Sequence, residues 1–376
     1  MDLVDKLYEN EDLEKKNVYS YSPFSYFSPS FSLLSHKNVR TAVINKDYEH
    51  FIEIIRRNLL PGIGNREVEE VFRNAMNRGI NSMNRLCLEN LGTNLDPFII
   101  EEVPYPLNLF SFLREASEDW INARNGKKTS TYDSKLLLEA YKRTRAFGLG
   151  YIILMIDESP EVLNSLRHRN LIRQWIDDSF RFRSPENTGI DDLPLSWKTD
   201  AGVRVYGNED PVRYRVKVLD EDDNLKYSSI LMKMFLKGEF PESIKDYVGV
   251  EFIVEGEDSR DELLGFFRGE FKISSRLESF KPPLIYGIKK RSLMSSPKFD
   301  CTKFIMRAAI QIESVPPLQQ GYERIPLEVQ ILTLKGQEQR KNDPEVEHRT
   351  YKERQFKQVF PLWFPREIYE PIIRNT

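Results

Sequence analysis

The stretch IPLEVQILT at residues 325–333 alternates apolar and polar side chains, which predicts a β-strand with two unlike faces. Because successive side chains of a strand point to opposite sides, its leucine, valine and isoleucines alternate with Glu328 and Gln330. We therefore expect this strand to cover an apolar core on one side and to present a carboxylate and an amide on the other.

A second apolar strand is expected at residues 247–254, directly after the carboxylate of Asp246. Gly249 within it leaves room for a close neighbour. Upstream, residues 212–218 alternate apolar with basic side chains, which predicts a strand with one basic face. Two carboxylates with cations nearby are what a magnesium-bridged triphosphate requires. Carboxylates are also common on solvated sheet faces, so the spacing alone leaves both interpretations open.

The rest of the chain divides by its periodicity. Apolar residues recur at helical spacing from Tyr48 to Met83 and again from Leu136 to Phe180. The stretch SPENTGIDDLP at residues 184–194 concentrates turn-forming residues and has no period. After it the period changes to that of strands. We expect an α+β fold. It consists of an aromatic, serine-rich arm (1–38), a mainly helical domain (39–183), a linker (184–200), a mixed-sheet domain (201–365) and a tail (366–376).

Composition excludes several classes. The chain has 376 residues, which fits two domains of about 150 residues each. Its net charge is −3, so no overall electrostatic attraction to duplex DNA is expected. It has two cysteines and four histidines, and neither a zinc site nor a disulfide framework is indicated. With no basic leader and no apolar run of about 20 residues, we expect a cytoplasmic protein without a membrane partner.

Four segments, in order, resemble motifs of the RelA/SpoT family of alarmone synthetases. The strand PLEVQILT is nearly identical to the family's P-x-E-V-Q-I-R-T, and IKDYVGVEFIV is close to its I-x-D-L-x-G-x-R-I-V. RVK followed by KYSSILMKMFLK is similar to its basic strand and lysine-serine helix, and EVEHRTYKE to its closing A-x-H-x-x-Y-K helix. The resemblance covers about residues 212–355 and implies a nucleotidyltransferase-like sheet domain.

The resemblance also implies an activity, the Mg²⁺-dependent transfer of pyrophosphate from ATP to the 3′-hydroxyl of a guanine nucleotide. The product is (p)ppGpp, the alarmone of the stringent response. Asp246 and Glu328 are then the catalytic and metal-holding carboxylates, and Glu328 is also placed to take the proton of the attacking hydroxyl. The implied nucleotide-binding residues are Arg215, Lys217, Lys226, Ser229, Lys233, Lys237, Lys298, Gln330 and His348. For His348 a packing or surface role is an equal alternative.

This sequence departs from the family pattern at the acceptor side. Glu251 stands where the family's strand has arginine. The acceptor loop is here KFDCTKFIMR, at residues 298–307, and lacks the Gly-Tyr whose tyrosine stacks on guanine. Phe299 or Phe304 could replace that stacking surface, although Phe304 fits better as a core residue. Arg307 stands near the position of the family's histidine.

Three functions therefore stay open. The first is an alarmone synthetase without the family's hydrolase half, whose histidine-aspartate doublet does not occur here. The second is a toxin-like relative that modifies an adenine nucleotide or the 3′ end of tRNA. The third is a catalytically inactive nucleotide-binding regulatory module. The helical domain, with Trp120 and Trp175, offers no chemistry of its own and fits regulation, a protein partner or homo-oligomerisation equally.

Overall fold

The computed structural model describes most of the chain between residues 42 and 363. The described residues are 42, 45, 47–60, 62–91, 99–104, 108–125, 134–217, 219, 225–237, 241–271, 277–280, 301–312, 321–344 and 348–363. The expected arm and tail, and Lys298 and Phe299 of the acceptor loop, lie outside them. No helix of the described part is both long and apolar enough to span a membrane.

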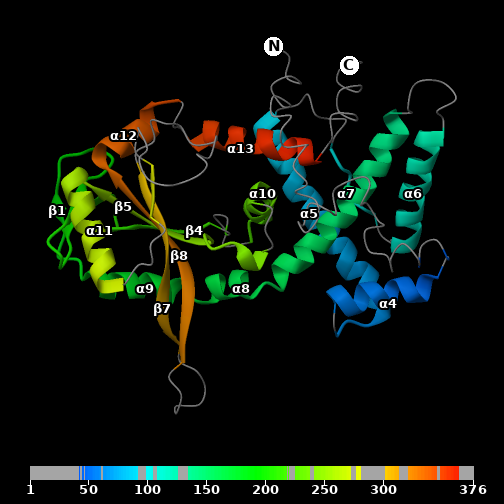
Figure 1. The fold of residues 1–376 in the computed structure, drawn as a ribbon, viewed down its shortest axis with the longest axis horizontal. Coiled ribbons are helices and arrows are strands. Elements are labelled where there is room, and N and C mark those ends of the chain that lie inside the picture. The colour runs from blue at the N-terminus through cyan, green and yellow to red at the C-terminus, as the bar shows by residue number, and fades with distance from the viewer. Residues whose placement is uncertain are drawn as a thin grey trace. The chain divides into compact units, whose positions relative to one another are not determined.

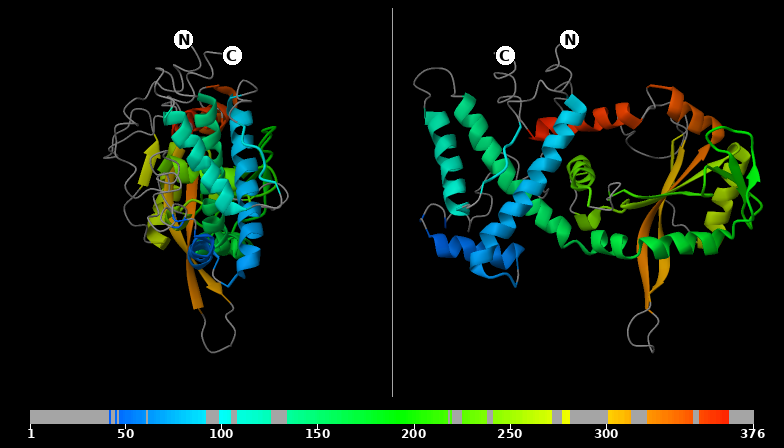
Figure 2. Two further views of the ribbon diagram at one scale, coloured as in Figure 1. Left: turned by 90° about the vertical axis from the view of Figure 1, so that its right-hand side faces the viewer. Right: turned by 180° about the vertical axis from the view of Figure 1, so that it is seen from behind.

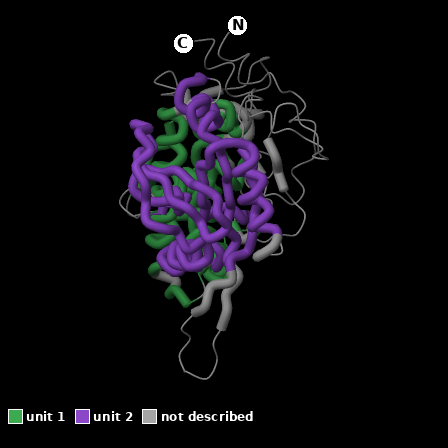
Figure 3. Tube along the Cα trace, turned by 90° about the vertical axis from the view of Figure 1, so that its left-hand side faces the viewer, with its two compact units in different colours: residues 1–159, 226–243, 353–376 green, residues 160–225, 244–352 purple. Residues whose placement is uncertain are grey.

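The chain forms two compact units, and each unit is assembled from separate stretches of sequence (Figure 3). Unit 1 comprises Met1–Ser159, Lys226–Ser243 and Glu353–Thr376. Unit 2 comprises Pro160–Leu225 and Ile244–Lys352. This division differs from the single boundary expected at residues 184–200. Residues 160–183, expected in the helical domain, belong to unit 2, whereas residues 226–243 and 353–365, expected in the sheet domain, belong to unit 1.

Unit 1 is built from helices α4 (Tyr48–Leu59), α5 (Asn65–Leu91), α6 (Leu109–Asn125), α7 (Ser134–Asp157) and α10 (Tyr227–Lys237), followed by the 3₁₀ turn η5 (Pro241–Ser243). It also contains residues 353–363 of α13 (His348–Trp363). Helices α5 and α7 cross closely, as Figure 2 shows. A Cβ atom on Gly79 would lie 2.7 Å from the Cβ of Leu149, and one on Gly150 would lie 2.5 Å from the Cγ of Met76. The two glycines therefore permit this close approach.

Unit 2 contains an eight-stranded mixed sheet, which agrees with the expected α+β class (Figure 1). The strand order is β1-β2-β3-β5-β8-β7-β6, and β4 also pairs with β5. Strands β5 and β8 are parallel, and the other pairs are antiparallel. The bounds are β1 Glu186–Asn187, β2 Leu195–Lys198, β3 Arg204–Gly207, β4 Arg213–Val216, β5 Val248–Val254, β6 Leu277–Phe280, β7 Cys301–Ile312 and β8 Gly321–Thr333.

One face of this sheet packs against helices α9 (Arg169–Phe180) and α11 (Glu257–Phe271). The shared core contains Phe180 of α9, Phe267 of α11, and Phe252 and Val329 of the two parallel strands. Phe304 of β7 is 1% exposed and packs edge-to-face on Phe267, which confirms its prediction as a core residue. Helix α8 (Pro160–Arg167) precedes α9 and also contacts β8.

The segment expected as a linker is part of the sheet. Residues 184–200 hold β1 and β2, which pair with each other, and β2 pairs with β3. Gly189 and Gly202 have positive φ angles of 75° and 84°. The turn-forming composition at residues 184–194 therefore marks a tight connection between short strands rather than a flexible linker.

The C-terminal end of the sheet leads into a helix that the sequence pattern did not predict. Thr333 ends β8 and its side chain accepts a hydrogen bond of 3.0 Å from the backbone N–H of Gly336, which caps α12 (Leu334–Asn342). Asp343 follows the last residue of α12 and forms its C-terminal cap. The closing helix is α13 (His348–Trp363). Helix α12 has an almost uniformly polar sequence, so it lacks the periodic signal of a packed helix.

Candidate functional site

The pairing register gathers polar side chains on the face of the sheet opposite α9 and α11. Glu328 of β8 stands opposite Gly249 of β5, and Gln330 stands opposite Glu251. Lys303 of β7 is the antiparallel partner of Gln330. Because side chains alternate along each strand, these positions share one face while their neighbours point into the core. The expected polar face of residues 325–333 is confirmed.

Glu328 lies at the centre of a buried cluster. Its side chain is 0% exposed, and the amines of Lys217 and Lys303 form ion pairs with Oε1 and Oε2, respectively. The amide of Gln330 donates a hydrogen bond of 2.7 Å to Oε1. Glu328 is therefore not on the solvated sheet face that its pattern alone would permit. Its charge is compensated by two ammonium groups and one amide donor.

Gly249 makes this arrangement possible. Lys217 follows β4 on one side of β5, whereas Glu328 belongs to β8 on the other side. A Cβ atom on Gly249 would lie 2.8 Å from Cε of Lys217 and 3.2 Å from its Nζ. The lysine side chain thus crosses β5 over the glycine to reach the carboxylate. The prediction that Gly249 leaves room for a close neighbour is confirmed.

Asp246, the other expected metal ligand, is 9% exposed and precedes β5 by two residues. In the ladder Glu328 stands opposite Gly249, three residues further along, which is a shift of about 10 Å along the strand. The register therefore does not set the two carboxylates side by side. Among the described residues, no group of three or more histidine, cysteine, aspartate and glutamate side chains could hold a metal ion.

This arrangement does not fit a resident Mg²⁺ ion at Glu328. Magnesium prefers oxygen ligands at octahedral positions and is usually bound through one or two carboxylates together with substrate phosphates. Both oxygens of Glu328 are already engaged by Lys217 and Lys303. Ammonium groups and a magnesium ion cannot occupy the same positions, so any Mg²⁺ at this carboxylate has to arrive with a ligand that draws the lysines away.

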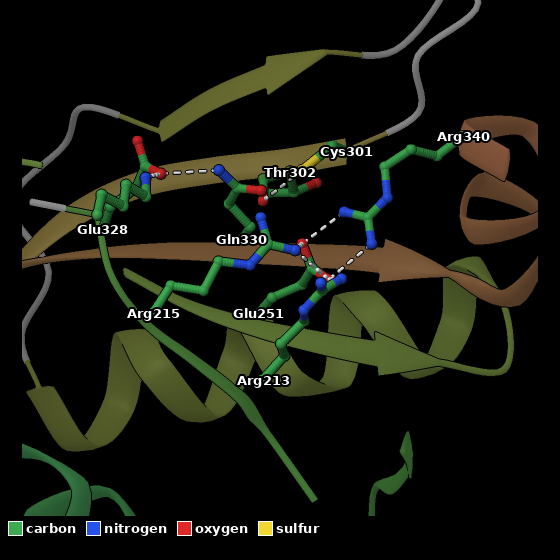
Figure 4. A network of polar contacts seen from close by, with 9 residues as sticks. Arg213, Arg215, Glu251, Cys301, Thr302, Glu328, Gln330 and Arg340 are labelled. Carbon is green, nitrogen blue, oxygen red and sulfur yellow. Dashed lines mark hydrogen bonds and ion pairs between the residues drawn. The ribbon is translucent and has the colours of Figure 1, made fainter. Parts of the chain in front are cut away.

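A second buried carboxylate, Glu251, lies on the same face and is 3% exposed. The guanidinium of Arg340, from α12, donates two hydrogen bonds of 2.6 and 2.8 Å to its two oxygens. Nη2 of Arg215 lies at 3.2 and 3.3 Å from the same oxygens, and Arg213 forms a longer ion pair of 3.9 Å. Figure 4 shows the three guanidinium groups around this carboxylate. Glu251, which replaces the arginine of the resembled motif, is thus enclosed by cations.

Burial and charge oppose each other at Glu251. Burial alone would raise the pKa of its carboxyl group, but the hydrogen bonds and charge of Arg340, with the charges of Arg215 and Arg213, outweigh this and lower that pKa. Across the two clusters, five cationic side chains surround two carboxylates. Three positive charges are left over among the residues that these ion pairs connect, so this face favours an anionic ligand.

Four of the expected phosphate-binding residues belong to unit 1. Lys226 directly precedes α10, and Ser229, Lys233 and Lys237 lie on it. Helix α10 packs on α5. The structure therefore brings Arg215, Lys217, Glu328 and Gln330 together on one sheet face, while the lysine-serine helix is part of the helical unit.

A hydrogen-bonded triad holds the start of α10 within unit 1. The hydroxyl of Tyr227 donates to Asp157 of α7 at 2.6 Å. Arg78 of α5 donates to Asp157 at 2.8 Å and to the Tyr227 oxygen at 2.6 Å. Burial, together with the hydrogen bond to Asp157, raises the pKa of Tyr227, so its hydroxyl stays a donor. Three helices that are distant in sequence are joined at this point.

Some expected residues cannot be placed in the site. Lys298 lies outside the described residues, and His348 begins α13 but its side chain is not described. Arg307 is exposed on β7, opposite Pro326. Sequence reasoning missed Lys303 and Arg340. Lys303 could have been found from the alternation of β7, whereas Arg340 lies on a helix without a periodic signal.

Compared with known proteins, the chain matches no family model, no curated protein and no solved structure. A functional assignment therefore rests on the residues of the site and on the resemblance of the four sequence segments.

Proposed function

We propose that this protein transfers pyrophosphate from magnesium-bound ATP to the 3′-hydroxyl of a nucleotide, in the manner of the RelA/SpoT synthetases that its motifs resemble. The observation that carries the proposal is the fully buried Glu328, held between Lys217 and Lys303 on a cation-rich sheet face. When the two ammonium groups turn to a bound phosphate chain, the released carboxylate can accept a proton beside that chain, which is the combination that such a transfer needs.

The cost of burying these groups supports a functional role. Removing a charge from water is expensive unless it is paired, and even a good buried ion pair stabilises a fold little compared with apolar packing. Two lysines contact Glu328. A polyphosphate chain provides anionic oxygens to which such ammonium groups can bind.

The proposed reaction assigns a step to each group. The acceptor 3′-oxygen forms a bond to the β-phosphorus of ATP, the bond from that phosphorus to the α–β bridging oxygen breaks, and AMP leaves. Glu328 takes the proton of the attacking hydroxyl. Lys217 and Lys303 move to the phosphate oxygens, which frees the carboxylate. Mg²⁺ bound to ATP would neutralise phosphate charge, and Asp246 would be the carboxylate of this chain that holds it.

The acceptor is the less defined substrate. Phe304 is buried in the sheet core and is therefore not free to stack on a base. Losing one aromatic platform costs about 1–3 kcal/mol of base binding. We therefore propose that guanine nucleotides are poorer acceptors here than in RelA/SpoT synthetases, and that an adenine nucleotide or the 3′ end of tRNA is the alternative.

A second candidate function is nucleotide binding without transfer. It is favoured by the contact between Arg215 and Glu251, because a residue expected to bind phosphate is engaged with an internal carboxylate. A regulatory module that binds nucleotides would need the cationic face but not a proton acceptor at Glu328.

A label-transfer assay separates the two functions. The full chain is incubated with γ-labelled ATP and Mg²⁺ and with GDP, GTP, AMP or tRNA in separate reactions. We expect label on one acceptor, lost in Glu328→Gln and retained in Glu186→Gln, a matched change at an exposed carboxylate of β1. Thermal unfolding of both variants controls for folding. Nucleotide binding without label transfer to any acceptor would favour the regulatory module.

A further inference from the structure

We propose that Arg213, Arg215 and Arg340 form a binding site for a di- or triphosphate group, in which Glu251 is a built-in counter-ion that the ligand partly replaces. This inference deepens the proposed function and rests on it, since it names the cations that recognise a phosphate chain. Its cations are arginines, whereas the cations around Glu328 on the same sheet face are lysines.

The three arginines are not equally committed to Glu251. Arg340 uses both of its terminal nitrogens on the two carboxylate oxygens, at 2.6 and 2.8 Å, which is the geometry of a strong fork-to-fork pair. Arg215 reaches the same oxygens only at 3.2 and 3.3 Å through a single nitrogen. Arg213 contributes a 3.9 Å ion pair. Arg340 is therefore satisfied, whereas the other two guanidinium groups keep most of their donors for another acceptor.

An unsatisfied donor marks the position of that acceptor. Nε of Arg215 is buried and has no hydrogen-bond partner among the described residues. Buried donors are nearly always paired, so an exception in a charged group calls for an explanation. Burial, followed by the nearby charges of Arg213 and Arg340, lowers the pKa of Arg215 against the pull of Glu251. An additional anion beside Arg215 would remove both costs.

The exposures of the three side chains show how a ligand approaches. Arg213 is 60% exposed, Arg215 is 34% exposed and Arg340 is 16% exposed. A ligand can therefore reach Arg213 and Arg215 from solvent while Arg340 stays on the inner side. Planar guanidinium groups bind phosphate oxygens in pairs, and two uncompensated charges match a di- or triphosphate better than a single carboxylate.

Glu251 has a defined part in this site. Without a ligand it holds three like charges together that would otherwise repel one another. With a ligand present it competes for the same donors, so it weakens binding. Removing its charge while keeping its shape should therefore strengthen anion binding, which a purely structural carboxylate would not do.

Calorimetric titration of the full chain tests this inference. The probes are sodium pyrophosphate and tripolyphosphate without Mg²⁺ or acceptor, with ATP and GDP as further arms that show which nucleotide supplies the phosphates. We expect Arg215→Gln to weaken tripolyphosphate binding about tenfold or more, since it removes a charge-assisted contact. Arg204→Gln, at an arginine of β3 paired with Glu186, should leave binding unchanged.

Glu251→Gln supplies the decisive comparison, because it should tighten tripolyphosphate binding several-fold while lowering the unfolding temperature. Unchanged affinity in Arg213→Gln and Arg215→Gln would overturn the site. An unfolding temperature that falls in Glu251→Gln with unchanged affinity would overturn the counter-ion role. The pyrophosphate and tripolyphosphate titrations contain no acceptor, so a failure of pyrophosphate transfer in the separate assay leaves this result intact.

Discussion

Glu328 and Glu251 lie on the same face of neighbouring parallel strands, yet their cations differ. Glu328 is paired with two lysines, and Glu251 is paired with three arginines. An ammonium group is a point charge on a flexible chain, whereas a guanidinium group is a rigid fork with fixed hydrogen-bond directions. The two carboxylates of one sheet face are therefore compensated by cations of different geometry.

The comparison is tested most severely by removing both lysines. The double variant Lys217→Met/Lys303→Met leaves Glu328 buried without a cation, which should lower the free energy of unfolding by about 3–5 kcal/mol. Adding Glu328→Gln to this variant should restore much of that loss, because the uncompensated charge is gone. Urea denaturation measures both. If the double variant is as stable as wild type, the buried lysine cluster is misassigned.

The loss of one arginine around Glu251 should destabilise the fold less than the loss of both lysines around Glu328. Arg340→Ala removes the bidentate partner of Glu251, but Arg215 and Arg213 remain close. We expect the free energy of unfolding to fall by about 2–3 kcal/mol, because Glu251 loses its best partner but stays close to two other arginines. The same urea titration checks it, with Arg204→Ala as the control. A loss below that of the control would contradict the structural part played by Arg340.

Gly249 lies beside the lysine cluster, so a substitution there tests that cluster alone. Gly249→Ala places a Cβ atom against the lysine side chain that crosses β5. Because that atom belongs to a flexible chain, the fold should lose little stability while Lys217 is displaced from Glu328. We expect about a tenfold loss in the rate of label transfer, as one charge-assisted contact is removed. A matched Gly256→Ala change, where a Cβ atom has open space, should leave the rate unchanged.

The smallest effect concerns acid stability. The pKa of Glu251 is lowered in the folded state, so its contribution is complete above the pKa of the unfolded chain, near 4.3, and is lost as the pH falls below it. Glu251→Gln should therefore lose less stability than wild type as the pH falls below about 4.3. Unfolding temperatures measured across this range give the difference. If the unfolding temperatures of both proteins fall equally with decreasing pH, Glu251 is excluded as a source of acid sensitivity.

Much of the sheet could be predicted from the sequence, because β5 and β8 have clear apolar patterns. The alternation in residues 325–333 also gave the polar face that holds Glu328 and Gln330. The register between the strands could not be read from the pattern, so the lysine that crosses Gly249 was not foreseen as a partner of Glu328. Pairing depends on contacts across the sheet, which no single strand encodes.

The division into two units could not be predicted from local sequence patterns either, because it also depends on contacts between distant segments. Helix α10 follows a strand of the sheet in sequence, but its apolar side packs on α5 and its first turn is held by Asp157. Likewise, α12 is specified by the Thr333 cap and by tertiary contacts rather than by an apolar stripe. Arg340, which α12 carries, could not be assigned to the site before that helix was known.

The most direct test of the account measures label transfer and tripolyphosphate binding side by side in Glu328→Gln and Glu251→Gln. The account predicts opposite outcomes. In transfer the two variants should differ: Glu328→Gln should lose at least about 100-fold, as expected for a proton acceptor, although release of Lys217 and Lys303 does not weaken its tripolyphosphate binding. Glu251→Gln should bind tripolyphosphate more tightly. If both substitutions change the two quantities alike, or if Glu328→Gln transfers label at the wild-type rate, the assignment of separate roles to the two carboxylates is contradicted.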